Sequence, residues 1–171
     1  RPSDDAFWVT ALDVGQGLAV VVQTAQHTLL YDAGPKFNSE ADSGNRVVVP
    51  YLRAIGIQRL DGMIVSHADS DHSGGALSVM HGVPIEWVAA SLPVEHPIAL
   101  NAKRFVPCFS GQNWQWDGVR FAVLHPAAES YDRRGVRGND RSCVLKVSTA
   151  SASALLAGDI DMGHARALLM L

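Results

Sequence analysis

The sequence predicts an α/β fold in which two sheets pack face to face and helices lie on the outside. Short apolar runs rich in β-branched residues occur in groups, and segments with helix-start and helix-stop signals separate these groups. A length of 171 residues with 47% hydrophobic content is sufficient for one domain with a real hydrophobic core. No internal repeat or low-complexity segment points to another architecture.

The N-terminal part is expected to contain three strands and then a helix. The turn Gly15-Gln16-Gly17 separates the first two strands, and the polar segment 35–44 is a predicted loop. A helix is expected from about Asn45 through Ala54, with Gly56 as its stop signal. The expected strands of this part are residues 7–14, 18–24 and 27–32.

The rest of the chain is expected to add short strands, a central helix and a final helix. Asp71 is a predicted cap for a helix from His72 to Gly82, and the final helix begins near Asp161 and is cut off at Leu171. Residues 142–148 and 152–157 read as a hairpin. The expected strands are residues 63–66, 87–90, 105–109, 119–124, 142–148 and 152–157.

The polar segment after the apolar run Met63-Ile64-Val65 is the main candidate for chemistry. It reads His67-Ala68-Asp69-Ser70-Asp71-His72 and is followed by Ser73-Gly74-Gly75. Imidazole nitrogens and carboxylate oxygens bind first-row metals, and several ligands from one loop lower the ordering cost of a site. The same residue types also serve in turns and helix caps. Four of them in six residues, after a strand, favour a metal-binding corner.

Bulk properties restrict the class of protein. A net charge of −3 argues against a surface that binds nucleic acid indiscriminately, although it leaves room for a local basic track. No apolar run is long enough for a membrane span, and Arg1 in place of an initiating Met suggests a piece of something larger. Cys108 and Cys143 are expected as buried thiols rather than a disulfide, which an extracytoplasmic location would permit.

Six segments resemble a known family when they are read in order. They resemble the metallo-β-lactamase superfamily, and more closely the C-terminal soluble domain of ComEC-type DNA internalisation proteins, the membrane channels of natural transformation. The resemblance implies an αββα sandwich and one domain over residues 1–171. The segments are Leu12-Asp13-Val14-Gly15-Gln16-Gly17, Tyr31-Asp32-Ala33-Gly34, Val49-Pro50-Tyr51-Leu52, the 67–72 cluster, Asn139-Asp140-Arg141-Ser142-Cys143-Val144-Leu145 and Leu155-Leu156-Ala157-Gly158-Asp159-Ile160.

The resemblance implies a centre for two divalent metal ions, Mn or Zn. It gives His67 to one metal and Asp71 with His72 to the other, and Asp159 is the expected bridge. Asp69 stands where most members carry histidine, and its harder oxygen favours manganese or magnesium over zinc alone. The catalytic carboxylates would be Asp69, Asp71 and Asp159.

Three further polar residues are assigned supporting parts by the same resemblance. Asn139 is a candidate ligand or substrate contact, and loop capping is an equally good reading of it. Asp32 and Ser142 are expected to orient ligands without binding metal themselves. In the family, a later strand carries a His-His-Gly type loop that completes the site. The chain has no such segment, so the domain is expected to be incomplete at its C-terminus, with weak or absent metal occupancy and possible inactivity.

Four arginines lie close together in a glycine-containing loop. They read either as a phosphate clamp that feeds a nucleic-acid strand to the metals or as a solvated loop that balances charge. These residues are Arg133, Arg134, Arg137 and Arg141.

The resemblance implies a metal-dependent phosphodiesterase, a nuclease that degrades one DNA strand during internalisation by two-metal hydroxide attack. Its partners would be single-stranded DNA and the transmembrane channel portion of the same parent chain. The parent would lie in the inner membrane, with this domain on the extracytoplasmic face. Two alternatives remain: a non-catalytic DNA-guiding module with a degenerate metal site, and a small-molecule metallo-hydrolase of the same fold.

Overall fold

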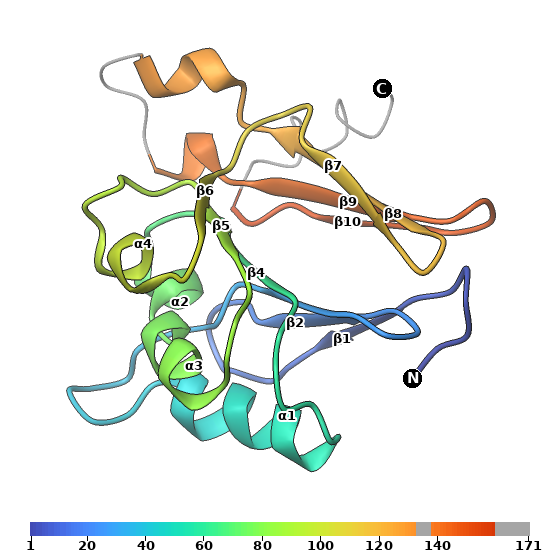
Figure 1. Ribbon diagram of the computed structural model, residues 1–171. Helices are drawn as coiled ribbons and strands as arrows, with labels where there is room; N and C mark the ends of the chain where they lie inside the picture. The colour runs from blue at the N-terminus through green and yellow to red at the C-terminus, as the bar shows by residue number, and fades with distance from the viewer. Residues whose placement is uncertain (133–137, 160–171) are drawn as a thin grey trace.

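A six-stranded sheet forms the centre of the computed structural model, which describes residues 1–132 and 138–159. The strand order is β1-β2-β3-β4-β5-β6 (Figure 1). The first three strands are antiparallel, and β3 to β6 are parallel. The bounds are β1 Trp8–Ala11, β2 Val20–Gln23, β3 Thr28–Tyr31, β4 Gly62–Val65, β5 Val88–Ala90 and β6 Phe105–Pro107.

A second, antiparallel sheet packs against one face of the first, with strand order β10-β9-β8-β7. Its strand β7 was not predicted from the sequence. It forms because Asp117 and Gly118 both take positive φ angles, 49° and 81°, which is the backbone of a tight hairpin turn. The bounds are β7 Asn113–Trp116, β8 Val119–His125, β9 Val144–Ser148 and β10 Ser153–Leu156.

Helices cover the other face of the first sheet (Figure 1). The helix predicted from Asn45 is present, but its first turn is a π-helix, η1 Gly44–Val48, which continues into α1 Val49–Ala54. The helix α4 Pro97–Asn101 was not predicted. Two 3₁₀ turns, η2 Ala128–Asp132 and η3 Asn139–Arg141, lie in the connection between β8 and β9. The predicted final helix from Asp161 lies outside the described residues.

The helix predicted from His72 to Gly82 is instead two short helices, α2 Ser70–Ser73 and α3 Ala76–Gly82. Gly74 and Gly75 lie between the two helices. The chain there packs so closely against the loop after β3 that a Cβ at either position would overlap the backbone of this loop. The predicted cap is also wrong: Asp69, not Asp71, precedes the first turn, and it makes no capping hydrogen bond.

Both faces of the sheet are buried at β2 to β5, so these strands read as nearly continuous apolar runs. Val21 and Leu30 point toward the helices and pack with Leu52. Their neighbours along the strands point toward the second sheet, where Tyr31 packs with Phe121. The resulting sandwich confirms the predicted fold class.

The aromatic residues of β7 belong to this second core. Trp114 stacks on Phe121 with 5.0 Å between ring centroids, and Trp116 stacks on His27 at 4.9 Å. Both rings therefore have packing partners inside the domain.

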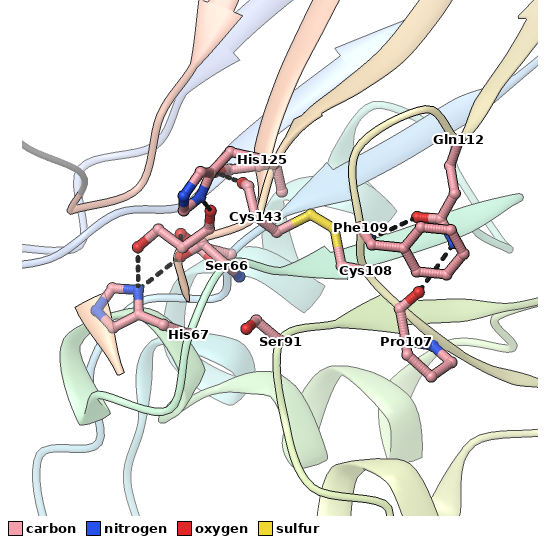
Figure 2. Close-up of a disulfide and its surroundings, with 12 residues drawn as sticks. Ser66, His67, Ser91, Pro107, Cys108, Phe109, Gln112, His125 and Cys143 are labelled. Atoms are coloured by element: carbon pink, nitrogen blue, oxygen red, sulfur yellow. Dashed lines mark hydrogen bonds between the residues drawn. A yellow bond between two sulfur atoms is a disulfide. The ribbon is translucent and has the colours of Figure 1, made fainter. Parts of the chain in front are cut away.

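A disulfide between Cys108 and Cys143 joins the two sheets, with 6.0 Å between the Cα atoms (Figure 2). Both residues are fully buried, as expected, but the prediction of two free thiols was wrong. The cysteines follow β6 and precede β9, so only the packing of one sheet on the other brings them together. Within residues 1–132 and 138–159, no helix is long and apolar enough to cross a membrane.

Candidate metal centre

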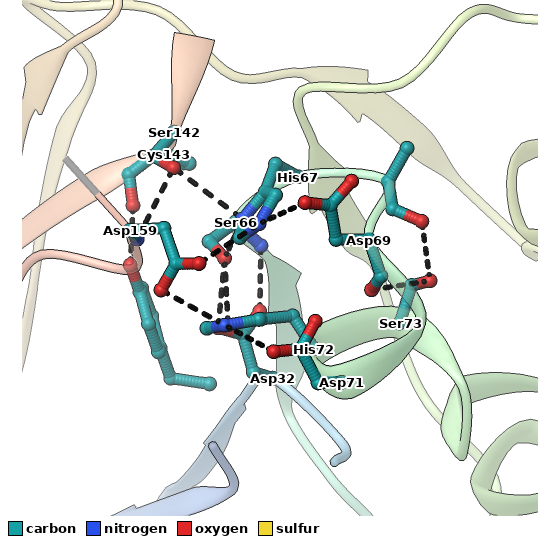
Figure 3. A network of polar contacts seen from close by, with 12 residues as sticks. Asp32, Ser66, His67, Asp69, Asp71, His72, Ser73, Ser142, Cys143 and Asp159 are labelled. Atoms are coloured by element: carbon teal, nitrogen blue, oxygen red, sulfur yellow. Dashed lines mark hydrogen bonds and ion pairs between the residues drawn. The ribbon is translucent and has the colours of Figure 1, made fainter. Parts of the chain in front are cut away.

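The 67–72 cluster lies where the first sheet ends and the second sheet approaches it (Figure 3). The buried strand β4 leads directly into Ser66 and His67, whose side chains are fully buried. The short helix α2 then places His72 beside His67, with 4.3 Å between the two ring centroids. A strand end followed at once by a helical turn thus brings two imidazoles together.

Hydrogen bonds indicate which nitrogen of the neutral His67 ring carries the proton. The hydroxyl of Ser66 donates to Oδ2 of Asp32 at 2.7 Å, so toward Nδ1 of His67, 2.9 Å away, it acts as an acceptor. This arrangement assigns the ring proton to Nδ1. The other nitrogen, Nε2, is left with a free lone pair.

Nε2 of His67 is buried and has no hydrogen-bond partner among the described residues. It lies 3.6 Å from Oδ2 of Asp69 and 3.7 Å from Oδ2 of Asp159. A lone pair that faces two carboxylates is an unfavourable arrangement unless a cation lies between them. This orphaned nitrogen is the observation that best fits a metal ion.

His72 is held in a similar orientation by a stronger contact. Its Nδ1 lies 2.7 Å from Oδ2 of Asp32, and its Nε2 lies 3.1 Å from Oδ1 of Asp159 and 3.9 Å from Oδ2 of Asp71. Burial lowers the pKa of His72, but the hydrogen bond and charge of Asp32, together with the charges of Asp159 and Asp71, raise it above its ordinary value. The ring is therefore surrounded by negative charge.

Asp32 orients both imidazoles, that of His72 by direct contact and that of His67 through the hydroxyl of Ser66. It is fully buried, with φ of 58°, and its Oδ1 accepts a hydrogen bond from the backbone N–H of Ser66 at 2.7 Å. Burial raises the pKa of its carboxyl group, while the hydrogen bonds from His72 and Ser66 act in the opposite direction. This geometry agrees with the predicted orienting role of Asp32.

Asp159 comes from the side of the second sheet and is the third residue after the end of β10. Gly158 precedes it with φ of 55°, and a Cβ there would lie 2.8 Å from Cβ of Ser66. Only glycine allows this close approach of the two sheets. One carboxylate oxygen of Asp159 faces His72 and the other faces His67, which is the geometry expected of a bridging ligand.

The donor set fits a divalent metal. Ligand atoms of His67, His72 and Asp159 all lie within 4.8 Å of one another. Asp69 flanks the set on the His67 side and Asp71 on the His72 side (Figure 3). Two neutral imidazole nitrogens with carboxylate oxygens suit zinc or manganese.

The structure brings most of the predicted site residues together. These residues are Asp32, His67, Asp69, Asp71, His72, Ser142 and Asp159. Asn139 lies in η3, and among the described residues its side chain makes no hydrogen bond to this set, so its predicted role stays a prediction. Sequence reasoning missed Ser66, although its place between β4 and His67 was a usable signal.

The arginine loop is described only in part. Arg133, Arg134 and Arg137 lie outside the described residues. Nε of Arg141 donates to the carbonyl of Ser130 at 3.1 Å, and its guanidinium lies 5.7 Å from the centre of the Tyr131 ring.

Comparison with known proteins gives long sequence matches. The chain is 38% identical over 161 residues to an uncharacterized protein, YcaI, of Escherichia coli and 39% identical over 160 residues to competence protein ComA of Neisseria gonorrhoeae. It is 32% identical over 160 residues to recombination protein 2 of Haemophilus influenzae. These matches cover 93–94% of the chain but only about a fifth of each relative. They confirm the resemblance to ComEC-type proteins.

Solved structures share the fold. A metallo-β-lactamase of Cronobacter sakazakii with a HARLDQ motif gives a TM-score of 0.58 at 19% identity, over 92% of this chain and 57% of that one. The model of the Metallo-beta-lactamase superfamily matches residues 12–165. Members of this fold bind divalent metals, in agreement with the donor set around Asp159. The chain therefore belongs to the metallo-beta-lactamase superfamily.

Proposed function

We propose that this chain is a metal-dependent phosphodiesterase domain that cleaves one strand of DNA during its uptake through a membrane channel. The observation that carries the proposal is the buried Nε2 of His67, which faces the carboxylates of Asp69 and Asp159 without a hydrogen-bond partner among the described residues. The substrate is supported by similarity to relatives named as a competence protein and a recombination protein.

Two metal positions are proposed from the distances. His67 with Asp69 would hold one ion and His72 with Asp71 the other, and Asp159 would contribute one carboxylate oxygen to each. When bound, such ions lower the pKa of water and neutralise charge on a phosphoryl group. The oxygen of Asp69 in place of imidazole favours manganese over zinc alone. Completion of the shell by a His-His-Gly type loop stays a prediction of the family resemblance.

The protein side chains have defined parts in this proposal. Asp32 and Ser66 keep the protons of the two imidazoles on Nδ1, so that both Nε2 atoms face the site. The side chains of Asp69 and Asp159 are 52% and 40% exposed, so a substrate would approach the centre from the side of these carboxylates. The arginine loop would hold phosphates of the DNA strand.

The location of the domain is also a proposal. The relatives are about five times as long as this chain, which supports a parent protein with a membrane channel portion. The disulfide between Cys108 and Cys143 supports the extracytoplasmic face, because disulfides persist in oxidising compartments and are rare in the cytosol.

The test is cleavage of end-labelled single-stranded DNA with manganese, by this chain and by the longer parent. Cleavage by the longer parent is expected with manganese, but not with a chelator and not in Asp159→Ala. This chain is expected to cleave weakly or not at all. The matched control Asp4→Ala changes an exposed aspartate at the N-terminus and should cleave like the wild type. Binding of DNA without cleavage by both chains would instead identify a DNA-guiding module. Cleavage of a small phosphodiester alone would indicate a small-molecule hydrolase.

A further inference from the structure

We propose that the Cys108–Cys143 disulfide is a covalent brace of the metal centre. The disulfide would hold Ser142 in place between two proposed metal ligands, His67 beside the first sheet and Asp159 beside the second. This inference rests on the metal site of the proposed function and deepens it. It assigns a positioning role to a bond that lies outside the ligand set itself.

The brace connects the backbone of both sheets beside the centre (Figure 2). On one side, the N–H of Cys108 donates to the carbonyl of Ala90 at 3.0 Å and so extends the pairing of β5 with β6. On the other side, the N–H of Cys143 donates to the carbonyl of Ser66 at 2.9 Å. The disulfide thus holds Cys143 next to the residue that precedes His67.

Ser142 transmits this restraint to the ligands. It is fully buried, and its hydroxyl oxygen lies 3.3 Å from Nδ1 of His67 and 3.4 Å from the backbone nitrogen of Asp159. Its carbonyl oxygen lies 2.8 Å from Nδ1 of His125, and this contact also holds the backbone of Ser142 in place. One serine therefore touches a ligand from the first sheet and a ligand from the second.

Two tyrosines secure the backbone at each end of the disulfide. The hydroxyl of Tyr31 donates to the carbonyl of Cys143 at 2.5 Å, and the hydroxyl of Tyr131 donates to the carbonyl of Cys108 at 2.6 Å. Neither half-cystine can shift without breaking one of these hydrogen bonds. The position of Ser142 is thereby fixed from several directions.

The consequence for the site is that the distances between the proposed metal ligands are fixed. His67 follows β4 of the first sheet, His72 lies in the adjoining α2, and Asp159 follows β10 of the second sheet. The distance from Asp159 to the two histidines therefore depends on how the sheets are held at this point. Metal affinity rises when ligands are already in place before binding. Loss of the disulfide should therefore weaken metal binding by more than the loss of fold stability explains.

The first test removes the disulfide with the double variant Cys108→Ala/Cys143→Ala. We expect manganese affinity, measured by calorimetry, to fall tenfold or more. We also expect the imidazole ¹⁵N resonances of His67 to shift in the metal-free protein, because Ser142 moves away from Nδ1. The resonances of His96, which lies beside α4 on the helical face, should not change.

The matched control is Leu52→Ala, which removes a buried side chain from the core between the first sheet and the helices. A disulfide also stabilises a fold in general, so the control must lose a similar amount of thermal stability. If Leu52→Ala weakens manganese binding as much as the double variant, the disulfide acts only on stability and the brace is refuted. An unchanged His67 spectrum in the double variant would refute it as well.

A second measurement uses the wild-type chain, in case the double variant does not fold. Dithiothreitol gives two electrons and two protons to the disulfide, which becomes two thiols while the reagent closes to its own cyclic disulfide. Coupling is reciprocal, so saturating manganese should raise the ratio of reduced to oxidised dithiothreitol that is needed for half reduction. This ratio should rise by the same factor by which reduction lowers the affinity for manganese. Equal reduction with and without manganese would overturn the proposal. If neither this chain nor the longer parent binds manganese, the proposed function fails, and the His67 resonances alone decide whether the brace positions the ring.

Discussion

The carboxylate of Asp32 and the imidazole of His72 form a fully enclosed pair, with 2.7 Å between Oδ2 and Nδ1. This contact fixes which nitrogen of His72 faces the candidate metal centre. Because Asp32 is not itself a proposed ligand, its side chain can be altered without removal of any ligand.

The Asp32→Asn variant should lower manganese affinity about 10- to 100-fold, the range found when an outer partner of a metal-bound histidine is lost. Asparagine tolerates the positive φ of 58° at this position, so the backbone should not change. Calorimetry on the wild type and the variant measures the effect, with thermal unfolding as a check of the fold. Unchanged affinity in a folded variant would show that Asp32 does not orient the ligands.

The Asp159→Ala variant should abolish DNA cleavage and leave the fold intact. The side chain is 40% exposed, so its loss should change the free energy of unfolding by only about 0.5 kcal/mol. Its two oxygens face both histidines, so the proposed bridge between two metals disappears. A variant that cleaves at the wild-type rate would reject the bridging role, and the exposed Asp4→Ala serves as the control for charge.

Asp117 should contribute stability that depends on pH. Its Oδ2 accepts hydrogen bonds from the hydroxyl of Thr24 at 2.6 Å and the N–H of Gln26 at 2.8 Å, and lies 3.0 Å from Nδ1 of His27. Burial raises the pKa of Asp117, but these hydrogen bonds and the charge of His27 outweigh it and hold the pKa well below its usual range.

A lowered pKa in the folded state gives stability that is present above the unfolded pKa, near 4, and is lost as the pH falls further. Asp117→Asn should therefore lower the free energy of unfolding by about 1–2 kcal/mol at pH 7. The difference from the wild type should shrink below pH 4. Denaturant unfolding at several pH values measures it, with Asp4→Asn as an exposed control. A difference that does not depend on pH would mean that the charge of Asp117 is not involved.

Much of this architecture could be predicted because it follows from patterns within short segments of the sequence. The apolar runs of β2 to β4 and the polar cluster after β4 are visible in the sequence, and so is Gly158-Asp159 at a strand end. The motif order then places Asp159 opposite His67. These features depend on residues that are neighbours in the chain or on a family resemblance.

What could not be predicted depends on contacts between distant segments. The disulfide joins residues 35 positions apart on different sheets, and no spacing rule indicates such a pair. The division of one predicted helix at Gly74 follows from the close approach of the loop after β3, which the helix pattern does not contain. Ser66 was missed because a single serine becomes informative only when Asp32 and His67 lie beside it.

The last prediction concerns the arginine loop. If Arg133, Arg134 and Arg137 contact the DNA backbone, their replacement by alanine should weaken binding of single-stranded DNA of every sequence alike. Each lost phosphate contact should also reduce the slope of log affinity against log salt by about 0.7. Binding titrations at several salt concentrations measure both quantities.

Hydrolysis of a small chromogenic phosphodiester should survive in this triple variant, because the proposed metal ligands at His67, His72 and Asp159 remain in place. The two readouts separate a phosphate clamp from arginines that act on the reaction itself, since the second kind would also lose small-substrate hydrolysis. Lys103→Ala, which removes one exposed cation paired with Glu86, is the control for loss of a positive charge elsewhere on the surface. If the triple variant keeps the affinity and the salt slope of the wild type, the loop is a connector, and the DNA substrate is supported by the family resemblance alone.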